Sequence, residues 1–576
     1  MEAAKLSDRS GDNRKLGVDM NYRDTYETWL AAIQAKDDIV GKEELLTELR
    51  SLDETGIEDA FYRELSFGTG GLRGTIGAGT NRMNVLTVAK ASQGLSDFLL
   101  KNYENPSVVI GFDSRLKSDV FAQEAGSVFA ANGIKVWAWN RLLPVPTVSF
   151  ATRYIGASAG VMITASHNPS QYNGYKVYGS DGCQITTEAA AEILAEIEKI
   201  DIFADVKRMP WASARIAGKI EFIPEKVLDY FIAEVKGQSV LYGDEVDRDV
   251  AIVYSPLNGT GLEPVTRVLE ETGFTNVTLV EEQRNPDGHF PTCPYPNPEI
   301  REAMELGLKY AAATGADLLL ATDPDCDRCG IAVKGADGYQ LLTGNEVGLL
   351  LLDFICSQRV KHHKMPANPV FIKTIVTIDL AEKIAARYGV KTVNVLTGFK
   401  FIGEVIGRLE DEREYICGFE ESYGYLTGSY VRDKDAVNAA FMICEMFAFY
   451  KTRGISLLQR LEEIYDTYGY CLNTLHSYEF PGSAGMEKMA EIMGEFRKGL
   501  PEIAGMQIVR IEDYLPGLNG LPKSDVLKFF TEKGSVVVRP SGTEPKLKLY
   551  VSVTEADRTA AEAVNKAIIA ELEKKL

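Results

Sequence analysis

The sequence predicts an α/β protein of about four domains, and two observations support this fold class. First, 576 residues are too many for one hydrophobic core, and the usual domain size suggests roughly four domains. Second, apolar strand-like runs alternate with amphipathic helical segments along most of the chain, which is typical of mixed sheets covered by helices on both faces. We therefore expect three α/β units followed by a smaller α+β domain.

The elements follow one another in a regular order. Charged helical segments over 26–35 and 43–52 come first, and we expect them on the outside of the first unit. The expected strands are 108–112, 134–139, 159–163, 250–254, 316–321, 369–373, 535–538 and 547–553. The expected helices are 88–100, 120–131, 264–272, 300–314, 379–388 and a closing helix from 555. The predicted domains are 1–212 with the helical extension, 213–345, 346–465 and 466–576.

Composition and charge limit the partners that this chain can have. Hydrophobic residues make up 45% and charged residues 25%, as in an ordinary soluble globular protein. The net charge of -20 argues against a nucleic-acid or anionic membrane partner. The N-terminus lacks a signal-peptide pattern, and no run approaches the ~18 apolar residues of a membrane span. Because a chain without a secretion signal stays in a reducing compartment, its scattered cysteines are expected to be reduced thiols. We therefore expect a cytoplasmic protein.

Cys326 and Cys329 form a C-x-x-C pair, a spacing found in redox and zinc sites. A thioredoxin-like pair opens a helix, but this pair precedes the strand-like run 330–333. The sequence contains no second such pair to complete a zinc site. We therefore expect neither role, although sensitivity of the pair to oxidation stays open.

The first candidate for chemistry is a serine that follows the apolar run 159–163. Ser166 lies in the polar turn Thr-Ala-Ser-His-Asn-Pro, and Lys176 follows ten residues later. A serine that accepts and returns phosphate needs a metal and a cation; Lys176 can supply charge, or a proton if its pKa is lowered. The simpler alternative is a turn-forming serine. His167 is kept as a catalytic candidate, although adjacency argues against a Ser–His pair.

A serine-hydrolase interpretation is excluded by element order. The segment 156–160 matches G-x-S-x-G, but a nucleophile elbow needs a helix after the serine, and strand-like residues follow here.

Three aspartates alternate directly after a predicted strand, where α/β folds bind ligands: Asp323, Asp325 and Asp327. An EF-hand is excluded because its sixth position is Arg328 instead of glycine and its twelfth is Lys334 instead of glutamate. Carboxylates this close repel one another unless a cation lies between them, and oxygen ligands suit Mg²⁺. Arg328 is placed to contact a transferring phosphoryl group.

Three further turns suit phosphate or sugar ligands. Arg539 opens the turn Arg-Pro-Ser-Gly-Thr, whose guanidinium, hydroxyls and glycine N–H suit a phosphate dianion. Arg73 lies in the glycine-rich turn 68–74, which lacks the Lys-Ser/Thr ending of a P-loop, so we expect phosphate rather than nucleotide contact. The turn 418–424 groups carboxylates and a hydroxyl that suit sugar hydroxyls. For each, an ordinary solvated turn is the alternative.

Together and in this order, the four motifs resemble the α-D-phosphohexomutase superfamily and, within it, the long phosphoglucomutase group, which includes phosphopentomutases. The resemblance extends from Gly68 to Lys546. It implies four domains around a central cleft, with three related α/β units and a smaller phosphate-binding fourth domain. It also implies that Ser166 carries a phosphate and binds Mg²⁺ together with Asp323, Asp325 and Asp327. The other implied site residues are Arg73, Lys176 and Arg328 at the transferring phosphate; Thr397, Lys400, Glu420, Ser422 and Lys434 at the sugar; and Arg539, Ser541, Gly542 and Thr543 at the distal phosphate.

The implied activity is that of an isomerase that interconverts glucose 1-phosphate and glucose 6-phosphate, with glucose 1,6-bisphosphate as intermediate and primer. Cys326 departs from the family, which usually has Ala or Gly there. The Glu-Glu-Ser-Tyr-Gly sugar loop favours glucose without excluding mannose or pentose.

Several alternatives stay open at this stage. They are a phosphopentomutase, a phosphomannomutase and a glucose-1,6-bisphosphate synthase, together with the anomer, the general base and a monomeric or homodimeric state. A non-catalytic phosphosugar sensor is disfavoured because no motif residue is missing. A phosphatase that uses Ser166 would keep no stable covalent phosphate.

Overall fold

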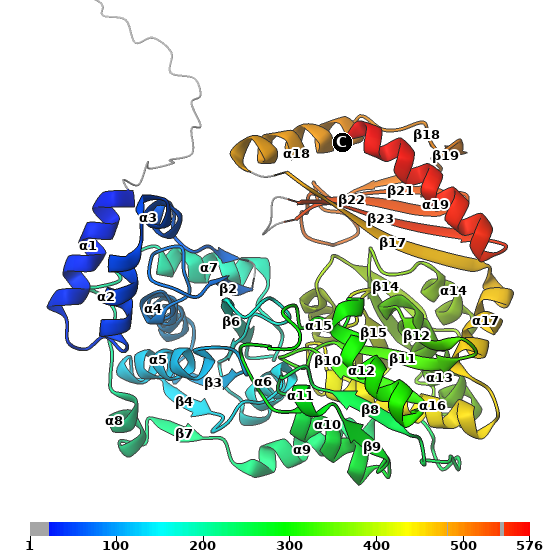
Figure 1. The fold of residues 1–576 in the computed structure, drawn as a ribbon, viewed down its shortest axis with the longest axis horizontal. Coiled ribbons are helices and arrows are strands. Elements are labelled where there is room, and N and C mark those ends of the chain that lie inside the picture. The colour runs from blue at the N-terminus through cyan, green and yellow to red at the C-terminus, as the bar shows by residue number, and fades with distance from the viewer. Residues whose placement is uncertain (1–21, 69, 481, 542–545) are drawn as a thin grey trace, which may run out of the picture.

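The protein is described by a computed structural model that covers residues 22–68, 70–480, 482–541 and 546–576. Two predicted site residues, Gly542 and Thr543, lie outside the described residues. Within them the chain forms three mixed α/β units and a C-terminal sheet with its own helices (Figure 1), so the predicted fold class is confirmed.

The first unit is built on a seven-stranded mixed sheet in the order β1-β2-β6-β5-β3-β4-β7. Its strands are β1 (Phe67–Gly68), β2 (Gly71–Thr75), β3 (Ser107–Phe112), β4 (Lys135–Ala138), β5 (Ala159–Ile163), β6 (Tyr172–Gly179) and β7 (Ile220–Phe222). The helices of this part of the chain are α1 (Tyr22–Ala35), α2 (Lys42–Ser51), α3 (Glu54–Phe61), α4 (Val85–Asn102), α5 (Ser118–Ala131), α6 (Val145–Ile155), α7 (Thr187–Ile197), α8 (Trp211–Ile216) and α9 (Glu225–Gly237). Helices α1–α3 lie at the outer edge (Figure 1), where Trp29 and Phe61 join the core of this unit.

The second unit has a five-stranded sheet in the order β12-β11-β10-β8-β9, in which β8, β9 and β10 run parallel. Its strands are β8 (Ile252–Ser255), β9 (Val277–Leu279), β10 (Leu318–Thr322), β11 (Cys329–Gly335) and β12 (Gly338–Leu342). Its helices are α10 (Leu262–Glu271), α11 (Glu281–Arg284) and α12 (Arg301–Thr314).

The third unit has a four-stranded sheet in the order β14-β13-β15-β16. Its strands are β13 (Val370–Thr374), β14 (Lys391–Val395), β15 (Tyr415–Phe419) and β16 (Tyr425–Thr427). Its helices are α13 (Gly344–Lys361), α14 (Leu380–Arg387), α15 (Phe399–Arg408), the 3-10 turn η1 (Glu412–Glu414), α16 (Ala436–Thr452) and α17 (Leu457–Tyr468).

The C-terminal part is an antiparallel sheet in the order β17-β23-β22-β21-β20 with a separate hydrophobic core, and it lies over the third unit (Figure 1). Its strands are β17 (Tyr470–Glu479), β20 (Arg510–Asp513), β21 (Leu527–Thr531), β22 (Gly534–Pro540) and β23 (Lys546–Glu555), with the small pair β18 (Glu502–Ile503) and β19 (Met506–Gln507). Its helices are α18 (Gly482–Arg497), α19 (Arg558–Leu572) and the 3-10 turn η2 (Glu573–Lys575).

One hydrophobic cluster connects the sheets of the first three units, and it includes Met162 of β5, Leu320 of β10 and Ile372 of β13. The packing fixes the carboxyl ends of these strands relative to one another, because protein interiors are close-packed and deform little. Among the described helices, none is both long and apolar enough to cross a membrane. The predicted domain boundaries remain predictions.

Candidate active site

Ser166 lies three residues beyond the end of β5, in a turn where its own backbone has an unusual conformation. Its φ is +53°, in the left-handed region that non-glycine residues rarely adopt, and its side chain is buried. The Thr164 hydroxyl accepts a hydrogen bond from the Ser166 N–H at 2.8 Å. Strained backbone that persists in a buried turn is typical of functional sites.

Arg115, which the sequence analysis did not single out, holds this turn in place. The residue follows β3, and its side chain is fully buried beside Asp113, with Nε 3.4 Å from Oδ2 of that carboxylate. The guanidinium donates hydrogen bonds to the carbonyl oxygens of Ser166, Asn168, Pro169 and Tyr172. The run Asp-Ser-Arg at the carboxyl end of a predicted strand was the sequence signal that could have identified it.

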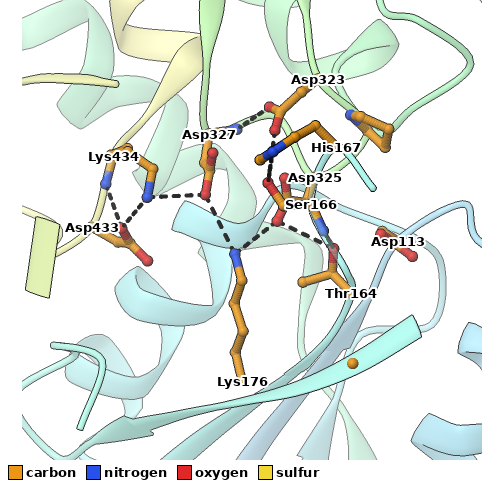
Figure 2. Close-up of polar contacts among 12 residues, drawn as sticks. Asp113, Thr164, Ser166, His167, Lys176, Asp323, Asp325, Asp327, Asp433 and Lys434 are labelled. Carbon is orange, nitrogen blue, oxygen red and sulfur yellow. Dashed lines mark hydrogen bonds and ion pairs between the residues drawn. The ribbon is translucent and has the colours of Figure 1, made fainter. Parts of the chain in front are cut away.

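The three aspartates meet Ser166 from the carboxyl end of β10 (Figure 2). Ser166 Oγ donates a hydrogen bond to Asp323 Oδ2 at 3.0 Å, and Asp323 Oδ1 accepts from the N–H groups of Asp327 (3.0 Å) and Arg328 (2.9 Å). All three carboxylates are buried, and one oxygen from each lies within 4.8 Å of the others. The structure thus brings together the four predicted metal ligands.

The donor set fits a divalent cation. Oδ1 of Asp325 and Oδ1 of Asp327 are buried and accept no hydrogen bond from any described residue. Burial and the two neighbouring carboxylates raise the pKa of Asp323 well above its ordinary value. Three buried carboxylates therefore disfavour a fully charged state, and a hard cation with oxygen ligands offsets that cost.

Two lysines face the cluster from other elements (Figure 2). Lys176 on β6 places Nζ 2.9 Å from Asp325 and 3.4 Å from Asp327. Lys434 places Nζ 3.2 Å from Asp327 and 3.1 Å from Asp433. Burial alone lowers the pKa of Lys176, but Asp325 and Asp327 outweigh it and raise that pKa, so the lowered pKa that the sequence left open is not found.

His167 also reaches the serine, contrary to the expectation from its position in the sequence. Its Nδ1 lies 3.1 Å from Ser166 Oγ, because the left-handed turn brings neighbouring side chains to the same side. Burial, followed by the charges of Arg328 and Arg73, lowers the pKa of His167 well below its ordinary value. The imidazole is therefore neutral at physiological pH.

Two arginines lie at the edges of the serine and aspartate loops. Arg73 on β2 donates from Nη1 to the side-chain oxygen of Asn168 at 3.3 Å. Arg328 forms an ion pair with Glu299. The charges of both arginines act on His167, next to Ser166, and their contact with a transferring phosphate stays a prediction.

The sugar-loop residues lie in the third unit. Glu420 is buried and accepts a hydrogen bond from the Gly398 N–H at 3.0 Å, while Ser422 is partly buried in the same turn. The Thr397 hydroxyl oxygen is buried and has no hydrogen-bond partner among the described residues. Lys400 on α15 lies beside Cys183 and Glu404, and burial lowers its pKa.

The C-terminal part approaches this loop through Arg539, at the end of β22. Burial and then the charge of Glu420 raise the pKa of Glu421 to about 7, and the nearby Arg539 opposes that shift. Ser541 follows and donates its backbone N–H to the Lys546 carbonyl at 2.7 Å. Of the predicted distal-phosphate residues, Arg539 therefore lies near the sugar loop.

A polar contact that the sequence analysis missed anchors the C-terminal part on the third unit. Lys528 Nζ contacts Asp379 Oδ1 and the Ile375 carbonyl, both at 2.9 Å, and the Ser535 hydroxyl donates to Asp379 Oδ2 at 2.6 Å. These partners are about 150 positions apart in the chain, so no local pattern reveals them.

Comparisons with known proteins agree with this arrangement. Sequence models of the phosphoglucomutase/phosphomannomutase family match the chain in four consecutive pieces: alpha/beta/alpha domain I at residues 64–203, domain II at 229–338, domain III at 343–468 and the C-terminal domain at 484–569. The chain belongs to the phosphoglucomutase/phosphomannomutase family.

Curated relatives support the family assignment, and a solved structure shares the fold. A phosphoglucomutase from Staphylococcus saprophyticus is 38% identical over 509 residues, which cover 86% of this chain and 91% of the relative. One from Staphylococcus aureus is 38% identical over 516 residues, with coverage of 87% and 92%. The open form of parafusin, a phosphoglucomutase from Paramecium, shares the fold with a TM-score of 0.69 at 18% identity, covering 89% of this chain and 95% of that one.

Cys326 stands where the family usually has Ala or Gly, and the structure gives no support for redox chemistry at this thiol. Cys326 and Cys329 are buried free thiols, and burial raises the pKa of each above its ordinary value. The protonated thiol is a poor nucleophile and metal ligand. Cys326 is a fully buried residue of the loop that carries the three aspartates.

Proposed function

We propose that this chain is a phosphoglucomutase that interconverts α-D-glucose 1-phosphate and glucose 6-phosphate through a phosphoserine at Ser166. The observation that carries the proposal is the hydrogen bond from the Ser166 hydroxyl to Asp323 within a buried cluster of three aspartates. A serine placed against a metal-binding cluster is suited to exchange phosphate, and the curated relatives are named phosphoglucomutase.

The residues of the cluster would hold Mg²⁺ through Ser166, Asp323, Asp325 and Asp327. When bound, the ion supplies Lewis-acid charge that stabilises the phosphoryl group in transfer. Cations of the protein neutralise the same charge: these are Arg73, Lys176 and Arg328.

Transfer breaks the bond between phosphorus and Ser166 Oγ and forms a bond between phosphorus and a free sugar hydroxyl. The proton of that hydroxyl ends on Ser166 Oγ, and Lys176, whose raised pKa keeps it charged, stabilises the phosphoryl group in transfer. The resulting glucose 1,6-bisphosphate reorients in the active site and then returns its other phosphate to Ser166. Positioning and charge neutralisation provide most of the catalysis, as is usual for phosphoryl transfer.

Substrate recognition would divide between two parts of the molecule. The sugar would be bound by Thr397, Lys400, Glu420, Ser422 and Lys434. The distal phosphate would be bound by Arg539 and Ser541, together with Gly542 and Thr543. The unpartnered Thr397 hydroxyl supports this assignment, because a buried hydroxyl without a protein partner is available to a ligand.

A coupled mutase assay tests the proposal. Protein is supplied with Mg²⁺ and a trace of glucose 1,6-bisphosphate, and turnover of glucose 1-, mannose 1- and ribose 1-phosphate is compared. We expect preference for glucose 1-phosphate and no turnover by Ser166→Ala. Preference for ribose or mannose 1-phosphate would make the chain a phosphopentomutase or phosphomannomutase with the same site, and normal turnover by Ser166→Ala would remove the serine from the mechanism.

A cytoplasmic location, small sugar phosphates as the partners, and a monomeric or homodimeric state complete the proposal. The location and the oligomeric state are measured by fractionation and by light scattering of the full chain.

A further inference from the structure

A second cavity lies away from the serine and its metal-binding cluster. It has a volume of about 580 Å³ and opens where the first and third units meet. Helices α6 and α9, the C-terminal half of α13 and the chain on either side of the β15–β16 hairpin contribute its walls. We call it the Arg359 pocket, defined by Arg153, Tyr154, Gln238, Arg359, Tyr415 and Tyr430.

Among the three arginines of this pocket, Arg359 is the one without a carboxylate partner among the described residues. Its Nε is buried without a hydrogen-bond partner, and among the described residues no carboxylate lies within ion-pair distance of its guanidinium. The other two arginines at the pocket are engaged: Arg153 contacts Glu412 and the Ser429 carbonyl, and Arg413 is paired with Asp411. Arg359 is only partly buried and lines the pocket, so an anionic ligand there would accept hydrogen bonds from its guanidinium.

Two stacked aromatic rings, Phe150 and Tyr154, line the pocket. Tyr154 stacks between Phe150, at 5.8 Å between ring centroids, and Tyr230, at 5.2 Å. Tyr154 and Tyr230 are nevertheless 47% and 48% exposed. Exposed stacked rings beside an unpaired arginine suit a ligand that joins a phosphate to a ring.

Two carboxylates also lie at the pocket and restrict what can bind. Glu412 is already held by Arg153 and Arg432, whereas Glu234 on α9 is exposed. Their oxygens repel a bare anion but accept hydrogen bonds from hydroxyl or amino groups. The chemistry therefore favours a phosphate monoester on a hydroxyl-bearing ring, which both a sugar phosphate and a nucleotide provide.

One segment, residues 428–434, connects the pocket to the active site. Ser429 and Tyr430 line the pocket, and Arg432 donates its N–H to Ser149 on α6 at 2.9 Å. The segment ends at Lys434, whose Nζ lies 3.2 Å from Asp327 of the metal-binding cluster. A ligand that shifts the first residues of this segment therefore acts on a lysine of the active site.

We propose that the Arg359 pocket is a second binding site for a phosphate monoester of a hydroxyl-bearing ring, coupled to the active site through residues 428–434. Arg359 binds the phosphate and Tyr154 contacts the ring. The coupling rests on the proposed mutase activity, whereas the binding does not, and linkage requires the coupling between two ligands to be reciprocal.

Binding is tested by titration calorimetry of the full-length protein with three probes: inorganic phosphate, glucose 6-phosphate and AMP. Arg359→Gln removes the charge at similar length, and Arg413→Gln is the matched control, because it removes an arginine at the same pocket that is exposed and already paired. We expect a binding event for a ring-bearing probe that Arg359→Gln weakens about 10-fold or more and Arg413→Gln leaves unchanged. The probe that responds distinguishes a sugar phosphate from a nucleotide.

Other outcomes overturn the proposal. Equal affinities and stoichiometries of the wild type and Arg359→Gln for all three probes would refute the site, and a response of inorganic phosphate alone would refute the ring contact. If Arg359→Gln does not fold, Tyr154→Ala replaces it, because that side chain is half exposed; it must weaken the ring-bearing probe and spare inorganic phosphate.

The coupling is measured separately in the mutase assay with AMP, which is neither substrate nor product of the proposed reaction. We expect AMP to change the apparent KM for glucose 1-phosphate about 5-fold in the wild type and not in Arg359→Gln. An unchanged KM in active enzyme that binds AMP would refute the coupling alone. Absence of mutase activity would instead refute the proposed function and leave the binding result standing.

Discussion

Arg115→Lys is the substitution that most directly tests how the serine turn is held. The arginine donates hydrogen bonds to four carbonyl oxygens of the turn and forms an ion pair with Asp113. A lysine has three N–H donors on one nitrogen, so at least one of these four carbonyl oxygens loses its partner. At ~1–3 kcal/mol for each unsatisfied buried group, the variant should lose at least about 1–3 kcal/mol of unfolding free energy.

The same substitution should reduce the rate of phosphate transfer more than substrate affinity. Ser166 depends on Arg115 for its left-handed turn, and a displacement of ~1 Å at a reacting atom can cost about 100-fold in rate. We therefore expect a large loss in kcat with little change in KM for glucose 1-phosphate.

Urea denaturation and the coupled mutase assay measure the two effects in one protein preparation. Arg208→Lys is the matched control, because Arg208 belongs to the same unit and its ion-pair partner, Glu124 at 2.7 Å, is within reach of a lysine. Wild-type stability together with wild-type kcat in Arg115→Lys would refute the reasoning that the guanidinium holds the turn.

Three further predictions concern the metal, the sugar loop and the C-terminal part. Added Mg²⁺ should raise the unfolding free energy of the wild type by about 2.7 kcal/mol at 100 times its Kd and raise that of Asp325→Asn much less, as thermal denaturation would show. Because the pKa of Glu421 is raised to about 7, the folded state binds its proton more tightly than the unfolded state, so stability conferred by this group is lost as pH rises from about 4.5 to 7. Glu421→Gln should therefore gain up to about 3 kcal/mol relative to the wild type between pH 5 and 7.5, and parallel denaturation curves would contradict this. Lys528→Met should cost about 1–3 kcal/mol by removing the closest cation of the partly buried Asp379, which keeps Lys373 at 3.3 Å, and hydrogen exchange would detect this as weaker protection of β21 and β22.

The fold was largely predictable because its signals are local. Apolar runs such as β5 and β13 are fully buried, and a strand buried on both faces reads as a continuous hydrophobic stretch. Strand β6 was not predicted, because its sequence Tyr-Asn-Gly-Tyr-Lys-Val-Tyr-Gly mixes glycines and polar residues with aromatic ones. Its burial comes from pairing with β2 and β5, which a local pattern does not contain.

The serine and the aspartates were visible for the same reason, since each motif fits within one turn. Their mutual position is not local: Ser166 and Asp323 are 157 positions apart and belong to different units. The contact between those units is close enough to exclude a side chain, because a Cβ on Gly288 would lie 2.5 Å from the Leu116 nitrogen, beside Arg115. The ring of Phe290 in turn lies 5.1 Å from the Arg115 guanidinium. A glycine of the second unit thus helps to set the geometry of a serine in the first, although no motif marks it as part of the site.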